Sequence, residues 1–272
     1  MRILMLVLTL LAATASDRAA DRQALLAADR ALALDGSSFT DSALYLHPGA
    51  PLVRGARQIN TYIANAKIAR SLKREPVFAD VSADGSLGYT WGWTLGDSTR
   101  GKYLACWRKI PSGWRLAAFA GTVPVPDSAP AQVTGKRDET TPVRGPANRR
   151  ELIKADSSFA AMSRARGAKH AFLSYAAEHA VSFGAAGTHF NEGREAIGAA
   201  FDKFPAGAVL EWRPVAAEIA KSGDLGCTVG EATIGSLHSY SKYLTIWKRQ
   251  ADKKWKFVAD GGNLRPAPAL QH

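Results

Sequence analysis

The sequence KYLACWR at residues 102–108 returns as KYLTIWK at residues 242–248. Other segments pair in the same order along the chain: ADGSLGYTWG at 83–92 with KSGDLGCTVG at 221–230, SGWRL at 112–116 with KKWKF at 253–257, and Ala28-Asp29 with Ala155-Asp156. The offset between partners drifts only from 127 to 141 residues. Solenoid repeats have periods of about 20–50 residues, so a spacing this long predicts two copies of one domain.

Each copy has the same expected order of elements. Apolar periodicity predicts first helices at about 19–34 and 149–165, and third helices at 56–66 and 194–204. A second helix is expected only in the second copy, at 170–179, and a short strand follows at 44–46 and 181–183. Four strands joined by hairpin turns close each copy, at 210–220, 225–234, 240–249 and 255–260 in the second. Helices followed by an antiparallel sheet indicate an α+β fold.

The N-terminus carries one arginine, the apolar run 3–11 and a small-x-small site at Ala13-Thr14-Ala15. This pattern predicts a secretory signal peptide over residues 1–15. A retained membrane anchor is the alternative, but the apolar run is much shorter than the ~20 residues that span a bilayer. We therefore expect a periplasmic or secreted protein without stable membrane insertion. The expected domains are 16–124 and 149–268, joined by a proline-rich linker at 125–148.

Composition restricts the function classes. The net charge is +11, but the excess is spread out: 14 Lys and Arg stand against 9 Asp and Glu in residues 16–125, and 15 against 12 in residues 151–272. No segment has the dense basic face that binds phosphates, so we expect no nucleic-acid partner. The cluster Lys253-Lys254-Trp255-Lys256 is interpreted as a charged hairpin tip. Cys106 and Cys227 are interpreted as two buried thiols, with an interdomain bridge as the alternative and a thiol nucleophile as a third.

The motifs quoted above, together with the closing WKFVADGGNLRP at 255–266, resemble SnoaL-like, ketosteroid-isomerase-like domains of the nuclear transport factor 2-like superfamily. They are most similar to exported bacterial members of uncharacterised function. The resemblance covers both copies and implies, for each, a cone-shaped domain in which a curved antiparallel sheet wraps around helices, with a pocket at its open end. It also implies sheet-to-sheet pairing, as an internal pseudo-dimer or a homodimer.

Isomerase-type members of the superfamily use a carboxylate base after the second helix, which corresponds here to Glu178, with Asp41 as the counterpart in the first copy. The tyrosine expected in the first helix is replaced by Phe159 and Leu32. Asp260 closes the last strand of the second copy, whereas the first copy has Phe119 there. The second copy is therefore the expected functional domain, with Glu178, His179 and Asp260 as candidate acid/base residues.

Strand alternation adds candidates for the pocket lining. Glu231 interrupts an otherwise apolar row, and pairs of aromatic residues share strand faces. The lining candidates are Tyr175, Glu231, Tyr243, Trp247, Trp91, Trp93, Tyr103 and Trp107. The histidines at 170, 179 and 189 match no metal-ligand spacing, so neither a metal nor a cofactor is expected.

Three function classes follow from these observations. The first is an exported protein that binds a small apolar or aromatic molecule without catalysis. The second is an isomerase- or dehydratase-type enzyme that acts on a small apolar carbonyl compound by carboxylate acid/base chemistry. The third is a module whose sheet faces serve protein interaction or dimerisation.

Overall fold

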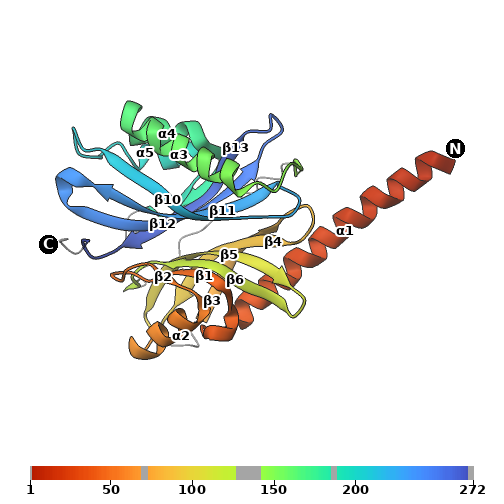
Figure 1. Ribbon diagram of the computed structural model, residues 1–272, viewed down its shortest axis with the longest axis horizontal. Helices are drawn as coiled ribbons and strands as arrows, with labels where there is room; N and C mark the ends of the chain where they lie inside the picture. The colour runs from red at the N-terminus through yellow and green to blue at the C-terminus, as the bar shows by residue number, and fades with distance from the viewer. Residues whose placement is uncertain (1, 69–72, 127–141, 185–188, 269–272) are drawn as a thin grey trace.

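The computed structural model describes residues 2–68, 73–126, 142–184 and 189–268, with side chains from residue 17 onward. Two α+β units follow one another along the chain, each a twisted sheet with helices on one face (Figure 1). The predicted class, two tandem α+β domains, is confirmed. The domain limits themselves stay a prediction, and residues 127–141 of the predicted linker lie outside the described part of the chain.

Domain one contains the long first helix and one mixed sheet. Its sheet has the strand order β2-β1-β6-β5-β4-β3, and β7 pairs with β5. The elements are α1 (Arg2–Ala31), the 3-10 turn η1 (Gly36–Ser38), β1 (Phe39–Leu46), β2 (Val53–Arg54), α2 (Ala56–Asn65), β3 (Lys73–Val81), β4 (Leu87–Leu95), β5 (Thr99–Ile110), β6 (Gly113–Gly121) and β7 (Val125–Pro126).

Domain two repeats this topology with the strand order β10-β11-β12-β13-β8-β9. The elements are α3 (Arg149–Arg166), α4 (Ala168–Tyr175), β8 (Ala176–Ser182), β9 (Asn191–Glu192), α5 (Arg194–Ala199), β10 (Leu210–Ile219), β11 (Leu225–Ile234), the 3-10 turn η2 (Gly235–Leu237), β12 (Ser239–Arg249) and β13 (Trp255–Leu264). Even the bulges recur, because the ladder shifts register after Pro76 in domain one and after Pro214 in domain two.

Two local expectations are wrong. The sheets are mixed rather than antiparallel, because β1 runs parallel to β6 and β8 runs parallel to β13. The second helix of domain two ends at Tyr175 instead of continuing to residue 179, because Ala176 already pairs with Phe257 of β13. Both differences have one cause: the strand after the first helices joins the sheet beside the last strand of its domain, a long-range pairing that local periodicity does not report.

The two sheets face one another, and the helices cover their outer faces (Figure 1). Alternation along β5 divides its side chains accordingly. Tyr103 and Trp107 pack with Leu25 and Ile59 of the helices, whereas Leu104 and Cys106 belong to a core cluster that continues into domain two. Trp91 and Trp93 of β4 face the same way, and each ring centroid lies 4.8 Å from that of Phe190.

A disulfide between Cys106 and Cys227 joins β5 to β11 across this contact, with 6.6 Å between the Cα atoms. The expectation of two free thiols is therefore wrong. Each cysteine lies on the sheet face that meets the other domain, a juxtaposition that neither local sequence shows. The closed loop spans 121 residues of separation, for which loss of unfolded-chain entropy stabilises the fold by about 4–5 kcal/mol.

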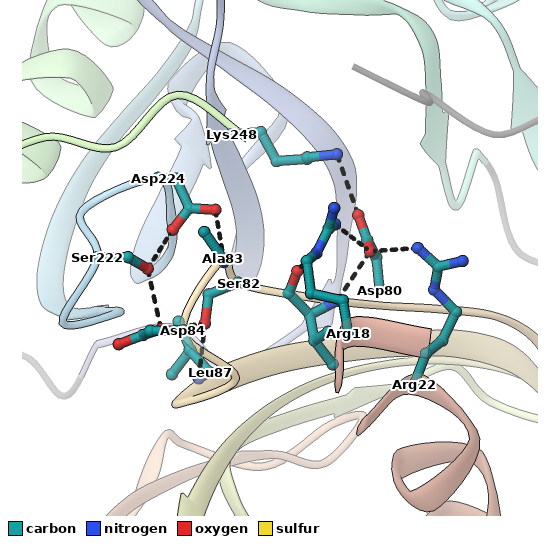
Figure 2. A network of polar contacts seen from close by, with 11 residues as sticks. Arg18, Arg22, Asp80, Ser82, Ala83, Asp84, Leu87, Ser222, Asp224 and Lys248 are labelled. Carbon is teal, nitrogen blue, oxygen red and sulfur yellow. Dashed lines mark hydrogen bonds and ion pairs between the residues drawn. The ribbon is translucent and has the colours of Figure 1, made fainter. Parts of the chain in front are cut away.

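Asp80, at the end of β3, connects three parts of the molecule (Figure 2). Its carboxylate lies 3.0 Å from Lys248 Nζ of β12, 3.1 Å from Arg18 and 2.9 Å from Arg22 of α1. Burial acts to raise the pKa of Asp80, but Lys248 and the two arginines outweigh it and lower the pKa below its usual value. Beside it the β3–β4 and β10–β11 turns meet: Asp224 accepts from the Ala83 amide, and Ser222 donates to Asp84.

No helix in the described part of the chain is both long and apolar enough to cross a membrane. Residues 2–15, the predicted signal peptide, continue directly into the rest of α1. The predicted cleavage and the periplasmic or secreted location stay predictions.

We expect Asp80→Asn to lower the free energy of unfolding by about 3–5 kcal/mol, because the buried ammonium group of Lys248 would lose its ion pair with Asp80. Urea unfolding at neutral pH measures this loss. The double variant Asp80→Leu with Lys248→Met removes both charges and should recover most of the stability. Equal losses in the single and double variants would show that the buried charge of Lys248 is not the cause of the destabilisation.

Candidate functional site

The interior of domain two holds a buried carboxyl group, Asp156, on the face of α3 that meets the sheet. Tyr243 donates its hydroxyl to Asp156 Oδ2 at 2.9 Å, and the Trp212 indole N–H donates to Oδ1 at 2.8 Å. Burial raises the pKa of Asp156, and hydrogen bonds from Thr228, Trp212 and Tyr243 offset only part of that effect. The carboxyl is thus held in place on both oxygens.

A second carboxyl group, Asp260 of β13, lies near this one. Thr245 donates its hydroxyl to Asp260 Oδ1 at 2.6 Å. Burial raises the pKa of Asp260 to about 7, with a further contribution from the charge of Asp156. A carboxyl with this pKa is divided between its protonated and ionised forms near neutral pH, so it can donate or accept a hydrogen bond.

A cavity of about 170 Å³ opens between the helices and the sheet; Asp260 lines it, and so do Tyr243 and Trp212, the two residues that donate to Asp156. Asp260, Tyr243 and Thr245 line its polar side, and Asp260 is the carboxyl that reaches the cavity itself. Its apolar wall is formed by Phe159, Phe172, Leu210, Trp212 and Ala232. The cavity is smaller than the roughly 300–1,000 Å³ typical of sites for drug-sized ligands, so it suits a small molecule.

Lys242 also borders the cavity, but its ammonium group is used elsewhere. The Nζ atom donates to the carbonyl oxygens of His47, at 2.9 Å, and Leu264, at 3.0 Å, and so ties domain two to domain one. Burial lowers the pKa of Lys242 to about 8. With these acceptors in place, the group acts as a structural clamp at the edge of the cavity.

Domain one has the same framework but packs its interior differently. Asp29 corresponds to Asp156 and accepts from Tyr103, at 2.5 Å, as Asp156 accepts from Tyr243. Arg74 occupies the sheet position of Trp212 and forms an ion pair with Asp29 at 3.1 Å, both side chains being fully buried. In domain one this ion pair balances the charge of Asp29. In domain two the corresponding carboxyl, Asp156, has Trp212 as its partner, a residue of the cavity wall.

Phe119 occupies the position of Asp260 in domain one. Its ring stacks on Tyr103 at 5.7 Å with an interplanar angle of 7°. The place of the second carboxyl is therefore filled by a packed ring. Both domains keep the Asp–Tyr pair but differ in two residues beside it: Arg74 and Phe119 in domain one correspond to Trp212 and Asp260 in domain two. In domain two these residues line a cavity, and one of them, Asp260, can titrate.

Among the predicted site residues, the structure brings Tyr243 and Asp260 together at the cavity. Trp247 is buried behind it and donates its indole N–H to Thr228 at 2.8 Å. Tyr175 stacks on Phe159, with 4.9 Å between the ring centroids, and lies on the outer side of that ring. Glu231 lies away from the cavity and pairs with Arg213 at 3.3 Å and with Arg265 at 3.6 Å.

Glu178 and His179 do not reach the cavity, since they are exposed residues of β8 rather than the end of a helix. Glu178 forms an ion pair with Arg194 at 2.8 Å. Together with Trp91 they line a separate open cleft beside the domain contact. A catalytic role for either residue stays a prediction, since neither residue lines the cavity.

The four aromatic candidates of domain one do not form one pocket. Trp91 and Trp93 face domain two, whereas Tyr103 and Trp107 belong to the core beneath the helices of domain one. The β4–β5 register pairs Trp91 with Leu104 and Gly92 with Tyr103, so the two aromatic pairs point to opposite faces of the sheet.

The residues that sequence reasoning missed are Asp156 and Trp212. A signal for Asp156 was available, because Leu152, Asp156 and Phe159 recur at i, i+4 and i+7 on one helix face. A carboxyl within such a row is a candidate buried acid. Trp212 carried no comparable signal, since its role depends on the strand β10 passing beneath α3.

The sequence matches no protein-family model and no curated protein. Similar solved structures include an NTF2-like protein of unknown function from Pseudomonas putida, with 16% identity, covering 44% of this chain and 89% of that one, at a TM-score of 0.37. An NTF2-like protein with a cystatin-like fold from Novosphingobium aromaticivorans has 18% identity, coverages of 46% and 89%, and a TM-score of 0.36. A ketosteroid isomerase-like protein from Erwinia carotovora has 11% identity, coverages of 42% and 94%, and a TM-score of 0.35.

The raised pKa of Asp260 predicts a pH dependence of stability. The folded protein keeps a proton on Asp260 that the unfolded chain releases near pH 3.8, so the contribution of Asp260 to stability is highest at low pH and is lost as the pH rises from about 4 to about 7. The full loss is up to about 4 kcal/mol for a shift of this size. Asp260→Asn should flatten this slope in urea unfolding measured across that range. An unchanged slope would show that Asp260 titrates normally.

Proposed function

We propose that domain two binds a small, mainly apolar molecule that carries a hydrogen-bond acceptor such as a carbonyl group. One observation carries the proposal: Asp260, with a pKa of about 7, lines a cavity whose opposite wall is aromatic and apolar. The protonated acid supplies a donor within an apolar site, where a hydrogen bond is stronger than in water.

The orientation of a bound molecule follows from the walls. Phe159, Phe172 and Trp212 form an aromatic wall for the apolar body. Thr245 donates to Oδ1 of Asp260 and leaves Oδ2 for the ligand. Tyr243 is committed to Asp156, so its hydroxyl proton is not available, and the acid of Asp260 is the donor that faces the cavity.

We infer in addition that the two copies act as an internal pseudo-dimer. The disulfide between Cys106 and Cys227 and the ion pair between Asp80 and Lys248 support this proposal, because both join strands of opposite sheets. In this arrangement domain one, with its interior packed by Arg74 and Phe119, serves as a fixed support for the binding domain.

A thermal-shift screen of small cyclic and aromatic ketones, with the matched hydrocarbons, tests the binding proposal. Ketones should raise the midpoint by binding only the folded state, and more so below pH 7, where Asp260 is protonated. The stabilisation should disappear in Asp260→Leu, which fills the same space without a donor.

Glu178→Gln is the matched control for that screen, since Glu178 is exposed and lies outside the cavity. Its ketone response should equal that of the unmodified protein. Loss of the response in Glu178→Gln with retention in Asp260→Leu would place the ligand in the cleft beside Trp91 and overturn the cavity assignment.

A second candidate function is acid/base catalysis on the same ligand, favoured by the two carboxyls of raised pKa in one interior. A group that titrates near pH 7 is suited to proton transfer at neutral pH. Exchange of the protons next to the carbonyl of a bound ketone, followed by NMR in D₂O, is the expected reaction. Asp260→Asn should slow this exchange by about 100-fold or more while leaving binding in place. Exchange no faster than in buffer would mean that domain two binds without catalysis.

A further inference from the structure

A second hollow of domain two lies on its outer side, between the first half of α3 and the turn that joins β12 to β13. Its volume is about 520 Å³. We call it the outer basic groove. It is lined by residues of α3, of the end of α4 and of the hairpin from β12 to β13.

Cations dominate the rim of the outer basic groove: five basic side chains line it, and Glu151 is the one acid among its lining residues. Arg249 pairs with that acid at 3.1 Å and lies over the Trp255 ring at 4.7 Å. Lys254 pairs with Asp252 at 3.3 Å, but both side chains are mostly exposed, so this pair is weak. Within the described chain, Lys154 and Lys253 have no ion-pair partner, which leaves a surplus of positive charge.

Neighbouring positive charges also affect Lys256, which lies inside the groove. Lys256 donates to the carbonyl oxygen of Ser174 at the end of α4. Its pKa is lowered by burial first, and further by the charges of Arg194 and Lys254, while Asp252 opposes the effect. An anion placed in the groove would relieve this repulsion.

The fold itself does not require these charges. In domain one the positions of Lys154, Lys253 and Lys254 are taken by Ala27, Ser112 and Gly113. The counterpart of Arg249 is Lys109, which forms an ion pair with Asp21. Lys154, Lys253 and Lys254 therefore belong to the second copy alone, the copy that also has the cavity, whereas Arg249 and Lys256 have the basic counterparts Lys109 and Arg115.

The floor of the outer basic groove is apolar. Ala155, Met162 and Tyr175 are partly buried and pack against the core of domain two. Phe159 separates this floor from the inner cavity, because Tyr175 stacks on one side of its ring and the cavity opens on another. The groove and the cavity are thus distinct sites with one shared wall.

We propose that the outer basic groove binds an organic anion: an apolar body against Met162, Ala155 and Tyr175, and a carboxylate, sulfonate or phosphate group held by Lys154, Lys253 and Lys254. The apolar floor distinguishes this class from inorganic phosphate, which needs no such surface. The concave shape between helix and hairpin distinguishes it from a flat, purely electrostatic surface.

Fluorescence titration of the full chain with 8-anilinonaphthalene-1-sulfonate, an aromatic anion, tests the proposal. The triple variant Lys154→Gln, Lys253→Gln, Lys254→Gln should weaken binding by about tenfold, because three attractive charges are removed from around the sulfonate. All three side chains are exposed, so the fold should be kept. Added salt should weaken binding to the unmodified protein and have less effect on the variant.

The control variant Lys73→Gln, Lys203→Gln, Lys221→Gln removes the same charge from exposed lysines outside the groove and should leave the affinity within about twofold. Equal weakening in both triple variants would show that binding depends only on the net charge of the protein, and it would overturn the proposed site. Vesicles of phosphatidylglycerol, tested by co-sedimentation, separate the two sources of an anionic group. If the groove variant loses vesicle binding but keeps its affinity for the sulfonate, the partner of the groove is a membrane surface and not a free organic anion.

Discussion

Leu104 and Cys106 of one sheet lie in the same buried cluster as Cys227 and Leu244 of the other. This contact between sheet faces is the constraint on which the rest of the molecule depends. A sheet has two faces, and here one face of each is used to hold the domains together, reinforced by the disulfide and by Asp80 with Lys248. Binding inside a domain is therefore restricted to the side that the helices cover, where the cavity of domain two lies.

The duplicated framework shows how little must change to convert a packed interior into a site. Both domains keep a tryptophan that donates to a threonine, Trp107 to Thr90 and Trp247 to Thr228, and both keep the Asp–Tyr pair. The Asp–Tyr bond joins the first helix of each domain to its sheet, and the Trp–Thr bond joins two neighbouring strands. The interiors differ because the aspartate has a different partner in each domain and because a different residue lies next to the tyrosine. An arginine and a phenylalanine give an ion pair and a stacked ring, whereas Trp212 and Asp260 accompany a cavity with a titratable wall.

Electrostatics separates the two proposed sites of domain two. The inner cavity lies beside two carboxyls whose pKa values are raised by burial, so it favours neutral molecules that accept hydrogen bonds. The outer basic groove carries a surplus of lysines in contact with solvent and favours anions. Phe159 lies between the two sites, in the cavity wall and stacked on Tyr175 of the groove.

The sequence by itself determined the duplication, the α+β class and most element positions, because repeats, periodicity and turn residues are local signals. Strand alternation, which is also local, placed Tyr243 among the candidates, and the comparison of the two copies placed Asp260 there, because the first copy has Phe119 at that position. Only the tertiary structure decided that Cys106 meets Cys227, that Glu178 and His179 lie on an exposed strand, and that Trp91 and Trp107 face opposite ways. It also decided that Asp156, Trp212 and Asp260 belong to one interior. Each of these depends on which strands pair and which faces meet, and such long-range contacts join residues 50 to more than 100 positions apart, as in Trp212 with Asp156 and Cys106 with Cys227.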